Sequence, residues 1–311
     1  VFVLAVLSGV AMMQAIRTWP PRPHPASRLP AERLWSGTLS GLRFARHSHL
    51  VLAQLLRTMA YSGAGSALWA LLPMIAARQL GLGATGFGLL MACLGTGAVA
   101  TGFVLGKLRA RVGLERLVAA CCLIFAAVMT VAALVHIHWV VYAALVLGGA
   151  AWMAVMATLN TATQTSAPPW VRSRAAALHT VSALGSFAIG SAFWGAVSGV
   201  AGLPVTLCLA AVAMAAGILL AKPFPLRMGE KHEVTPGTPW EELFVVAEPD
   251  PDDGPVAVEL GYRIREGESE AFLEAVAQLK APRRRDGATF WRIYRDLGDP
   301  SRYVERFIVT S

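Results

Sequence analysis

The stretch of the chain between residues 50 and 220 is almost free of charged side chains. It contains eight Lys or Arg residues and a single acid, Glu115. The whole chain of 311 residues is 55% hydrophobic and only 15% charged, whereas soluble domains carry about 25% charged residues. So few charges cannot cover the surface of a soluble fold of this length. The sequence therefore predicts a membrane protein.

Six apolar runs are long enough to cross a bilayer, which requires about 20 mostly apolar residues per helix. Turns that contain Gly, Pro or charged residues separate them. We predict six spanning helices, at residues 50–76, 85–105, 117–135, 139–163, 175–198 and 203–220. The spacings Gly102-x-x-x-Gly106 and Gly195-x-x-x-Gly199 predict close contacts between helices, because they let two backbones approach.

The loops between the runs alternate in charge. The connections at residues 18–49, 107–116, 168–174 and 222–231 are basic, while the loops between them carry one Lys or Arg or none. Positive loops stay on the cytoplasmic side of a membrane, so we expect the first loop and the C-terminal residues to be cytoplasmic. This topology also explains the net charge of +8, and nucleic acid is not an expected partner.

The residues before and after the six-helix region, at 50–222, form further segments. Residues 1–16 are too short for a full span and predict the end of a preceding transmembrane helix. Residues 17–49 predict a basic cytoplasmic loop, with a short amphipathic helix at residues 32–46 that lies on the membrane surface. Residues 223–255 predict a linker, because they are rich in Pro, Gly and acids.

Residues 256–311 predict a small α+β domain. Strand patterns at residues 256–264, 289–297 and 302–309 and a helical pattern at residues 266–279 give the order β-α-β-β. This order is part of a ferredoxin-like unit, and the domain is predicted to be truncated because a last helix and strand are absent. Phe290, Trp291, Tyr294 and Tyr303 alternate as the core of a sheet should.

The loop between the second and third spans carries a motif. Gly106, Arg111, Gly113 and Arg116 resemble the cytoplasmic Gly-x-x-x-Asp-Arg-x-Gly-Arg-Arg loop of the major facilitator superfamily. Ala110 stands where that family has its acid, which weakens a role in a charge latch. Six spans after a long basic loop resemble the second half of a twelve-helix transporter of this superfamily, so the resemblance implies a partner N-terminal half that is missing here.

A closer resemblance is to the transmembrane secretion effector family, which is related to the enterobactin exporter. It is carried by residues 66–73, 149–152, 158–161, 166–175 and 284–288. It implies efflux of small amphipathic molecules, siderophore-like or drug-like, driven by a cation gradient across a bacterial inner membrane. The C-terminal domain resembles an antibiotic-biosynthesis-monooxygenase domain, which implies a possible homodimer through that domain.

Two predicted helices carry polar and aromatic side chains at steps of three or four residues, and therefore along one face. The resemblance implies that these two helices line the central cavity, where such a face suits an amphipathic ligand. The candidate substrate-cavity residues are Gln54, Thr58, Tyr61 and Trp69 on the first span and Trp152, Met156, Asn160 and Gln164 on the fourth. The alternative is packing, because Asn and Gln also join helices within membranes.

Two ionisable residues are candidates for coupling to an ion gradient. Because no predicted span contains an acid, a coupling carboxylate is expected in the missing half. Arg57 either extends to the cytoplasmic interface or pairs with an acid of that half. His179, with an ordinary pKa near 6.5, either carries protons or is a solvated interfacial side chain.

The sequence offers no cofactor or metal site and no enzyme chemistry. The four cysteines lie within apolar runs without metal-ligand spacing, and free thiols there behave as small apolar side chains. We expect a transporter rather than an enzyme. The alternatives are a membrane-anchored sensor or scaffold that uses the C-terminal domain as a dimerising module, and a tethered oxygenase.

Overall fold

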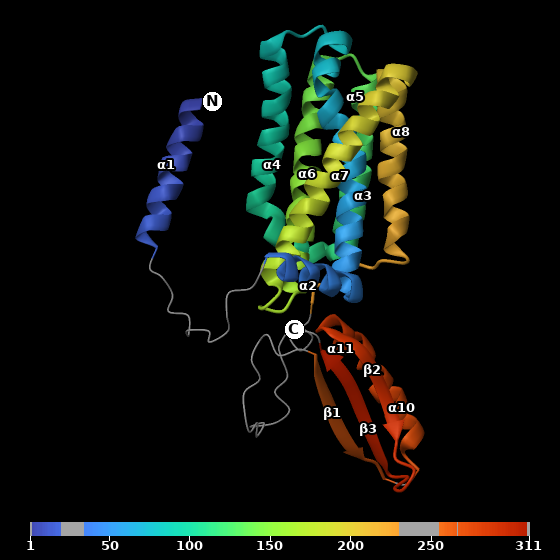
Figure 1. The fold of residues 1–311 in the computed structure, drawn as a ribbon. Coiled ribbons are helices and arrows are strands. Elements are labelled where there is room, and N and C mark those ends of the chain that lie inside the picture. The colour runs from blue at the N-terminus through green and yellow to red at the C-terminus, as the bar shows by residue number, and fades with distance from the viewer. Residues whose placement is uncertain (1, 20–33, 230–254, 266, 310–311) are drawn as a thin grey trace.

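The computed structural model describes residues 2–19, 34–229, 255–265 and 267–309. Among these residues, six helices are long and apolar enough to cross a membrane, as predicted. They stand side by side as a bundle (Figure 1). The helices of the membrane region are α1 (Phe2–Thr18), α2 (Leu34–His47), α3 (His49–Met74) with a π-helical turn η1 (Ile75–Gln79), α4 (Ala84–Val112), α5 (Leu114–Leu134), α6 (His138–Thr165), α7 (Arg172–Ala201) and α8 (Leu203–Ala216) with a 3-10 turn η2 (Gly217–Ala221).

Helix α3 packs against α6, α7 and α8, while α4 packs mainly on α6. Two crossings depend on glycine. A Cβ atom at Gly97 of α4 would overlap the Val146 carbonyl oxygen of α6, and one at Gly190 of α7 would overlap the Gly63 carbonyl oxygen of α3. The backbones therefore approach more closely than any larger residue would allow.

The glycines of the two Gly-x-x-x-Gly pairs do not lie at such close crossings. A Cβ atom at Gly102, Gly106, Gly195 or Gly199 would meet nothing within 4 Å in the part of the chain that the structure describes. The helix contacts predicted at these spacings are therefore absent there, because the four glycines lie on outward faces of α4 and α7.

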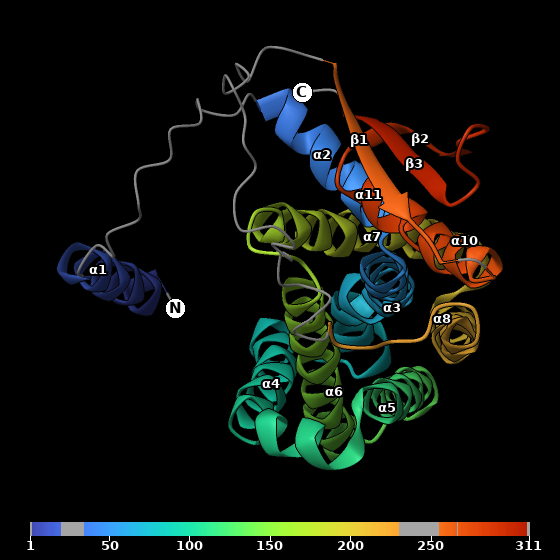
Figure 2. The ribbon, with the colours of Figure 1, turned by 90° about the horizontal axis from the view of Figure 1, so that it is seen from below.

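Helix α2 lies across one end of the bundle (Figures 1 and 2). Its Phe44 and Ala45 are buried, and Phe44 packs edge-on against Trp170 with ring centroids 5.9 Å apart. The predicted amphipathic helix is thus present. We call this end of the bundle the α2 end. Helix α1 stands apart from the bundle in Figure 1, and its side chains from Val6 to Trp19 are exposed.

Part of the predicted basic loop, at residues 20–33, and most of the predicted linker, at residues 230–254, lie outside the described residues. The loop predicted at residues 107–116 is mostly helical, because α4 continues to Val112 and α5 begins at Leu114. Lys and Arg are good helix formers, and their charges are favourable at a helix C-terminus. The break is Gly113, with a φ of 78° that glycine adopts without strain.

The C-terminal domain contains three strands in the described residues, β1 (Val256–Arg263), β2 (Ala288–Arg295) and β3 (Arg302–Val309), close to the predicted ranges. The sheet has the order β1-β3-β2 with antiparallel neighbours. Two helices, α10 (Ser269–Ala277) and α11 (Lys280–Arg285), connect β1 to β2. This arrangement is a split β-α-β unit with β3 between the two parallel strands.

The aromatic residues of the sheet occupy two faces. Phe272 of α10 lies 5.2 Å from the rings of both Tyr262 and Tyr303, so this helix covers the face to which they point. Trp291 is on the same face, since it lies opposite Phe307 in the register and donates to Glu305. Because successive residues of a strand point to opposite sides, Phe290 and Tyr294 face away. The expectation that these four residues belong to the core of the sheet is therefore wrong for Phe290 and Tyr294.

Beneath α10 and α11 lies one buried carboxylate, that of Glu305, whose side chain is fully buried. It accepts hydrogen bonds from the Tyr262 hydroxyl at 2.7 Å, the Trp291 indole at 2.9 Å and the Arg283 guanidinium at 3.0 Å. Such a group is stable only when fully paired, so Glu305 ties β3 to both neighbouring strands and to α11.

We predict that the C-terminal domain loses stability in acid because of Glu305. Burial raises its pKa, but the hydrogen bonds from Arg283, Tyr262 and Trp291 outweigh burial and hold the pKa below the ordinary value of 4.5. A lowered pKa contributes stability above the ordinary value, and that stability is lost as the pH falls through the folded-state pKa.

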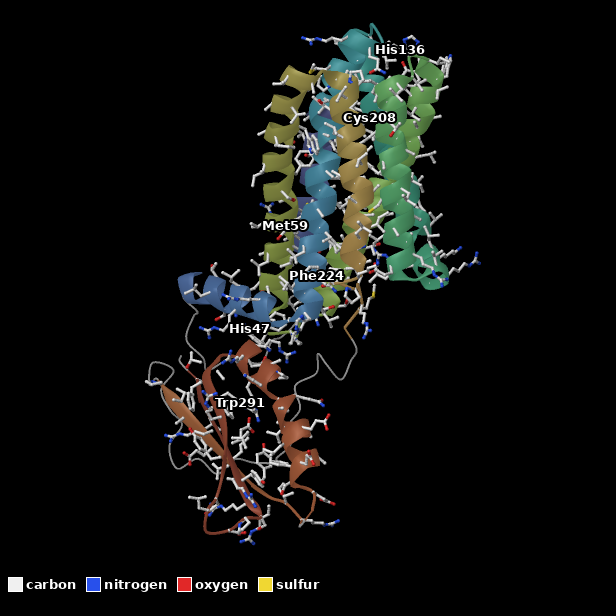
Figure 3. All side chains as sticks on the ribbon, turned by 90° about the vertical axis from the view of Figure 1, so that its right-hand side faces the viewer. His47, Met59, His136, Cys208, Phe224 and Trp291 are labelled. Atoms are coloured by element: carbon white, nitrogen blue, oxygen red, sulfur yellow. The ribbon has the colours of Figure 1, made fainter. Side chains whose placement is uncertain are left out.

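The Trp291 indole reports this loss by fluorine NMR of fluorotryptophan-labelled protein, with the signal assigned from Trp291→Phe (Figure 3 labels the residue). We expect Glu305→Gln to be less stable near neutral pH and to lack the acid transition. An unchanged acid transition in that variant would show that another group is responsible.

Candidate functional site

The bundle contains a cavity of about 370 Å³ between α3, α6 and α7. The volume lies within the range of about 300–1,000 Å³ that is typical of small-molecule sites. Apart from one hydroxyl, the lining is apolar and aromatic. The residues are Ser62 and Trp69 of α3, Trp152 and Met156 of α6, and Ala183, Leu184 and Phe187 of α7.

Trp152 is the centre of an aromatic cluster at this cavity. Its ring centroid lies 5.4 Å from that of Tyr61, 5.6 Å from Phe125, 5.8 Å from Trp69 and 6.1 Å from Phe187. These separations are typical of favourable aromatic contacts. The cluster joins α3, α5, α6 and α7, so it holds the wall of the cavity in place.

Two polar atoms of this cluster lack a hydrogen-bond partner. The Tyr61 hydroxyl and the Trp69 indole nitrogen are both buried, and neither has a partner among the described residues. Buried Tyr and Trp side chains usually pair these atoms, and an unpaired buried donor costs about 1–3 kcal/mol. Trp69 lines the cavity whereas Tyr61 does not, so a ligand with an acceptor atom that displaces the surrounding side chains would satisfy the Trp69 nitrogen.

The eight predicted cavity residues divide into two groups. Trp69, Trp152 and Met156 line the cavity, and Tyr61 belongs to the aromatic cluster beside it. The other four lie nearer the α2 end. There the Gln164 amide donates to Asn160 Oδ1 at 2.7 Å.

Gln54 and Thr58 belong to a buried polar network. The Gln54 amide nitrogen donates to Ser166 Oγ and to the Arg227 carbonyl oxygen, both at 3.0 Å. The Thr58 hydroxyl lies 3.3 Å from His179 Nδ1. His179 is only 4% exposed, so it is not the solvated interfacial side chain that was one of the two expectations.

Arg57 is buried and pairs within this bundle. It is 3% exposed, and its two terminal nitrogens each lie 3.3 Å from a carboxylate oxygen of Glu115, at the start of α5. Glu115 also accepts from the Leu226 backbone N–H at 3.2 Å. The acid that pairs with Arg57 therefore belongs to this bundle and not to another half, and it lies in the connection predicted at residues 107–116.

The motif residues themselves make few contacts. Gly106, Arg111, Gly113 and Arg116 are exposed. Of the basic residues around this motif, Arg109 is the one that reaches α6. Its Nε donates to Thr158 Oγ1 at 2.8 Å and an Nη to Thr161 Oγ1 at 3.3 Å, which ties the end of α4 to α6.

Sequence reasoning missed the α7 side of the cavity as well as Arg109 and Glu115. Polar and apolar side chains are mixed around α7, so no stripe marks Leu184 or Phe187. Glu115 carried a signal, since it is the one acid between residues 50 and 220 and a lone acid near a membrane pairs with a base. Among the described residues, no group of three or more His, Cys, Asp or Glu side chains could hold a metal ion.

Comparison with known proteins agrees with this architecture. A family model described as a transmembrane secretion effector matches residues 1–311. No curated protein matches the chain. The resemblance to this family seen in the sequence is thereby confirmed, and the bundle is that of a multi-pass membrane protein.

Proposed function

Because the chain belongs to the transmembrane secretion effector family, we propose that it is part of a permease that exports small amphipathic molecules by alternating access. The observation that carries this proposal is the cavity between α3, α6 and α7. Its aromatic walls suit the apolar part of a ligand, and the unpaired Trp69 indole suits an acceptor atom on a siderophore-like or drug-like molecule.

The exposed side of α7 supports completion of the cavity by another six-helix half. Val181, Leu184, Ile189 and Phe193 are 56–74% exposed although all are large and apolar. In a full transporter such a face packs against a second half or against lipid. We propose that the N-terminal half of the permease supplies the opposite wall, and that the cavity opens to alternate sides as the halves rock.

We propose that the α2 end is cytoplasmic, because the basic connections meet there and positive loops favour that side. We propose that the membrane is the bacterial inner membrane. Export would be driven by a cation gradient. Within the described residues, the one acid of the bundle, Glu115, is already paired with Arg57, so we assign ion coupling to a carboxylate of the other half.

The C-terminal domain is proposed as a dimerising module rather than an enzyme. The face of its sheet away from α10 carries Phe290 and Tyr294, and Tyr294 is 47% exposed. A second copy of this face is a suitable partner for such a surface.

A matched pair of substitutions tests the cavity. Leu184 and Val181 both lie on α7 and are 65% and 68% exposed, but only Leu184 lines the cavity. In cells that express the complete transporter, we expect Leu184→Trp to slow export about tenfold. Crowding a filled site costs about 1–3 kcal/mol, and 1.4 kcal/mol is a factor of ten. Val181→Trp should export at the wild-type rate.

Retention of ethidium and of a catecholate siderophore measures the two rates, with membrane levels of each variant as a control. Equal loss in both variants would contradict the placement of the ligand. If the wild-type protein exports neither probe, these ligand classes are rejected and the membrane-anchored sensor gains support.

A further inference from the structure

A second cavity lies where the C-terminal domain meets the α2 end of the bundle. Its volume is about 380 Å³, and Figure 3 places His47 at this junction, with His136 at the opposite end of the bundle. Three parts of the fold build the wall, namely the α2–α3 junction, the end of α6, and α11. The lining residues are His47, Ser48, His49, Leu50, Ser166, Ala281, Pro282 and Arg285.

The titratable side chains that line this cavity are all basic. They are His47, His49 and Arg285, and no acid lines it among the described residues. The nearby carboxylate of Asp286 is half exposed and accepts from Arg285 Nε at 3.0 Å. This contact occupies one edge of the guanidinium, and in the described part of the chain the two terminal nitrogens of Arg285 have no acceptor. The guanidinium thus retains the paired donors that bind phosphate or carboxylate.

Ser166 adds a donor from the membrane side. Its hydroxyl oxygen accepts from the Gln54 amide at 3.0 Å and from the Gly229 backbone N–H at 3.1 Å. A hydroxyl has two lone pairs and one proton, so both lone pairs are used while the proton has no acceptor among the described residues. Ser166 is 5% exposed and lines the cavity, so an anion there would receive this proton.

The start of α3 also favours an anion in this cavity. Ser48 is the N-cap of this 26-residue helix and His49 its first residue, and the first N–H groups of a helix favour an anion. Donors therefore reach the cavity from three directions, from α11, from the α2–α3 junction and from the end of α6. A tetrahedral phosphate can accept from all three directions, because its oxygens are not confined to one plane as those of a carboxylate are.

We propose that this junction binds a phosphate monoester or diester about the size of glycerol phosphate, which bridges α11 to the start of α3. The cavity volume falls within the range of small-molecule sites. The bridge would add to the contact that already holds the two parts together. In that contact the Arg285 guanidinium lies 5.6 Å from the Phe44 ring centroid, and Phe44 packs on Trp170 of the bundle. The bound phosphate would hold the C-terminal domain against the bundle.

The source of the phosphate is either a lipid headgroup or a soluble ester, and hydrogen exchange can separate them. The full chain is kept in micelles of a maltoside detergent, which contains no phosphate, and is exposed to glycerol 3-phosphate, or is kept in the same micelles with added phosphatidylglycerol. We expect amides at residues 47–50 and 280–286 to exchange at least about tenfold more slowly in one of these arms. Protection by glycerol 3-phosphate identifies a soluble ester, and protection only with phosphatidylglycerol identifies a lipid headgroup.

A matched pair of variants distinguishes the site from a general basic surface. Arg285→Gln should abolish the protection, whereas Arg284→Gln removes the same charge from an exposed neighbour that does not line the cavity and should keep it. Ser166→Ala should weaken it several-fold, and exchange in α4 and α5 checks that this variant is folded. Protection in neither arm, or equal loss in Arg284→Gln and Arg285→Gln, would overturn the proposal.

Discussion

Replacing Glu115 with glutamine should lower the free energy of unfolding of the bundle by about 3–5 kcal/mol, the range for breaking a buried ion pair from one side. The reason is the guanidinium of Arg57, which is 3% exposed and has both terminal nitrogens on the Glu115 carboxylate. Glutamine leaves that charge buried without a counterion. It also weakens the acceptor of the Leu226 N–H.

Replacing the other partner of the pair, Arg57, should lower the free energy of unfolding by less. Arg57→Met leaves a carboxylate whose side chain is 36% exposed, so water can solvate it, and the expected loss is about 1–2 kcal/mol. The asymmetry is the distinguishing result, because a pair of equal burial would give equal losses. Unfolding in mixed micelles of increasing sodium dodecyl sulfate, followed by helical circular dichroism, measures both values.

Arg116→Gln is the control for these two variants. Arg116 neighbours Glu115 on α5 but is exposed, so its removal should change the unfolding free energy by less than about 0.5 kcal/mol. If Glu115→Gln left the free energy of unfolding unchanged, the pair would not form in the folded bundle.

The two sides of the substrate cavity differ in how well the sequence predicts them. Helices α3 and α6 carry polar and aromatic side chains at steps of three or four residues, which stand out against their apolar residues. That pattern identified Trp69, Trp152 and Met156, which the structure brings to one cavity. Helix α7 carries small polar residues such as Ser182, Ser186 and Ser191 mixed with apolar ones around its circumference. Without a polar face no periodicity indicates which side Leu184 and Phe187 occupy, and only packing determines it.

The buried polar groups show a second limit of the sequence. Hydropathy gave the depth of Arg57 and His179 along their helices, but it contains no information about rotation or about partners on other helices. Arg57 meets Glu115, 58 residues later, and Thr58 meets His179, 121 residues later. Both pairs depend on which helices are neighbours. The C-terminal strands were easier to predict, because alternation and turn residues are local signals.

Glycine spacing is a third limit of the sequence, because the spacing alone does not show which glycines lie at a helix crossing. The glycine at the crossing of α4 and α6 gives the second large expected effect on stability. Gly97→Ala should lower the unfolding free energy by at least about 3 kcal/mol, at the upper end of the usual cost of overpacking. The added methyl group would overlap the Val146 carbonyl oxygen and crowd the Ala150 backbone nitrogen of α6. Backbone atoms cannot rotate away as a side chain can, so α4 and α6 must separate. Separation would also stretch the 3.3 Å bond from the Thr101 hydroxyl to the Ala150 carbonyl oxygen.

Gly102→Ala, five residues further along α4, is the matched control. Nothing among the described residues lies within 4 Å of a Cβ atom at Gly102, and alanine is favoured over glycine in a helix by about 0.5–1 kcal/mol. This variant should therefore be neutral or slightly more stable in the same detergent titration. The two substitutions add the same methyl group to the same helix, so an opposite sign isolates the crossing with α6 as the cause. Equal destabilisation would instead mean that Gly102 also faces a close neighbour, as its place in a Gly-x-x-x-Gly spacing first indicated.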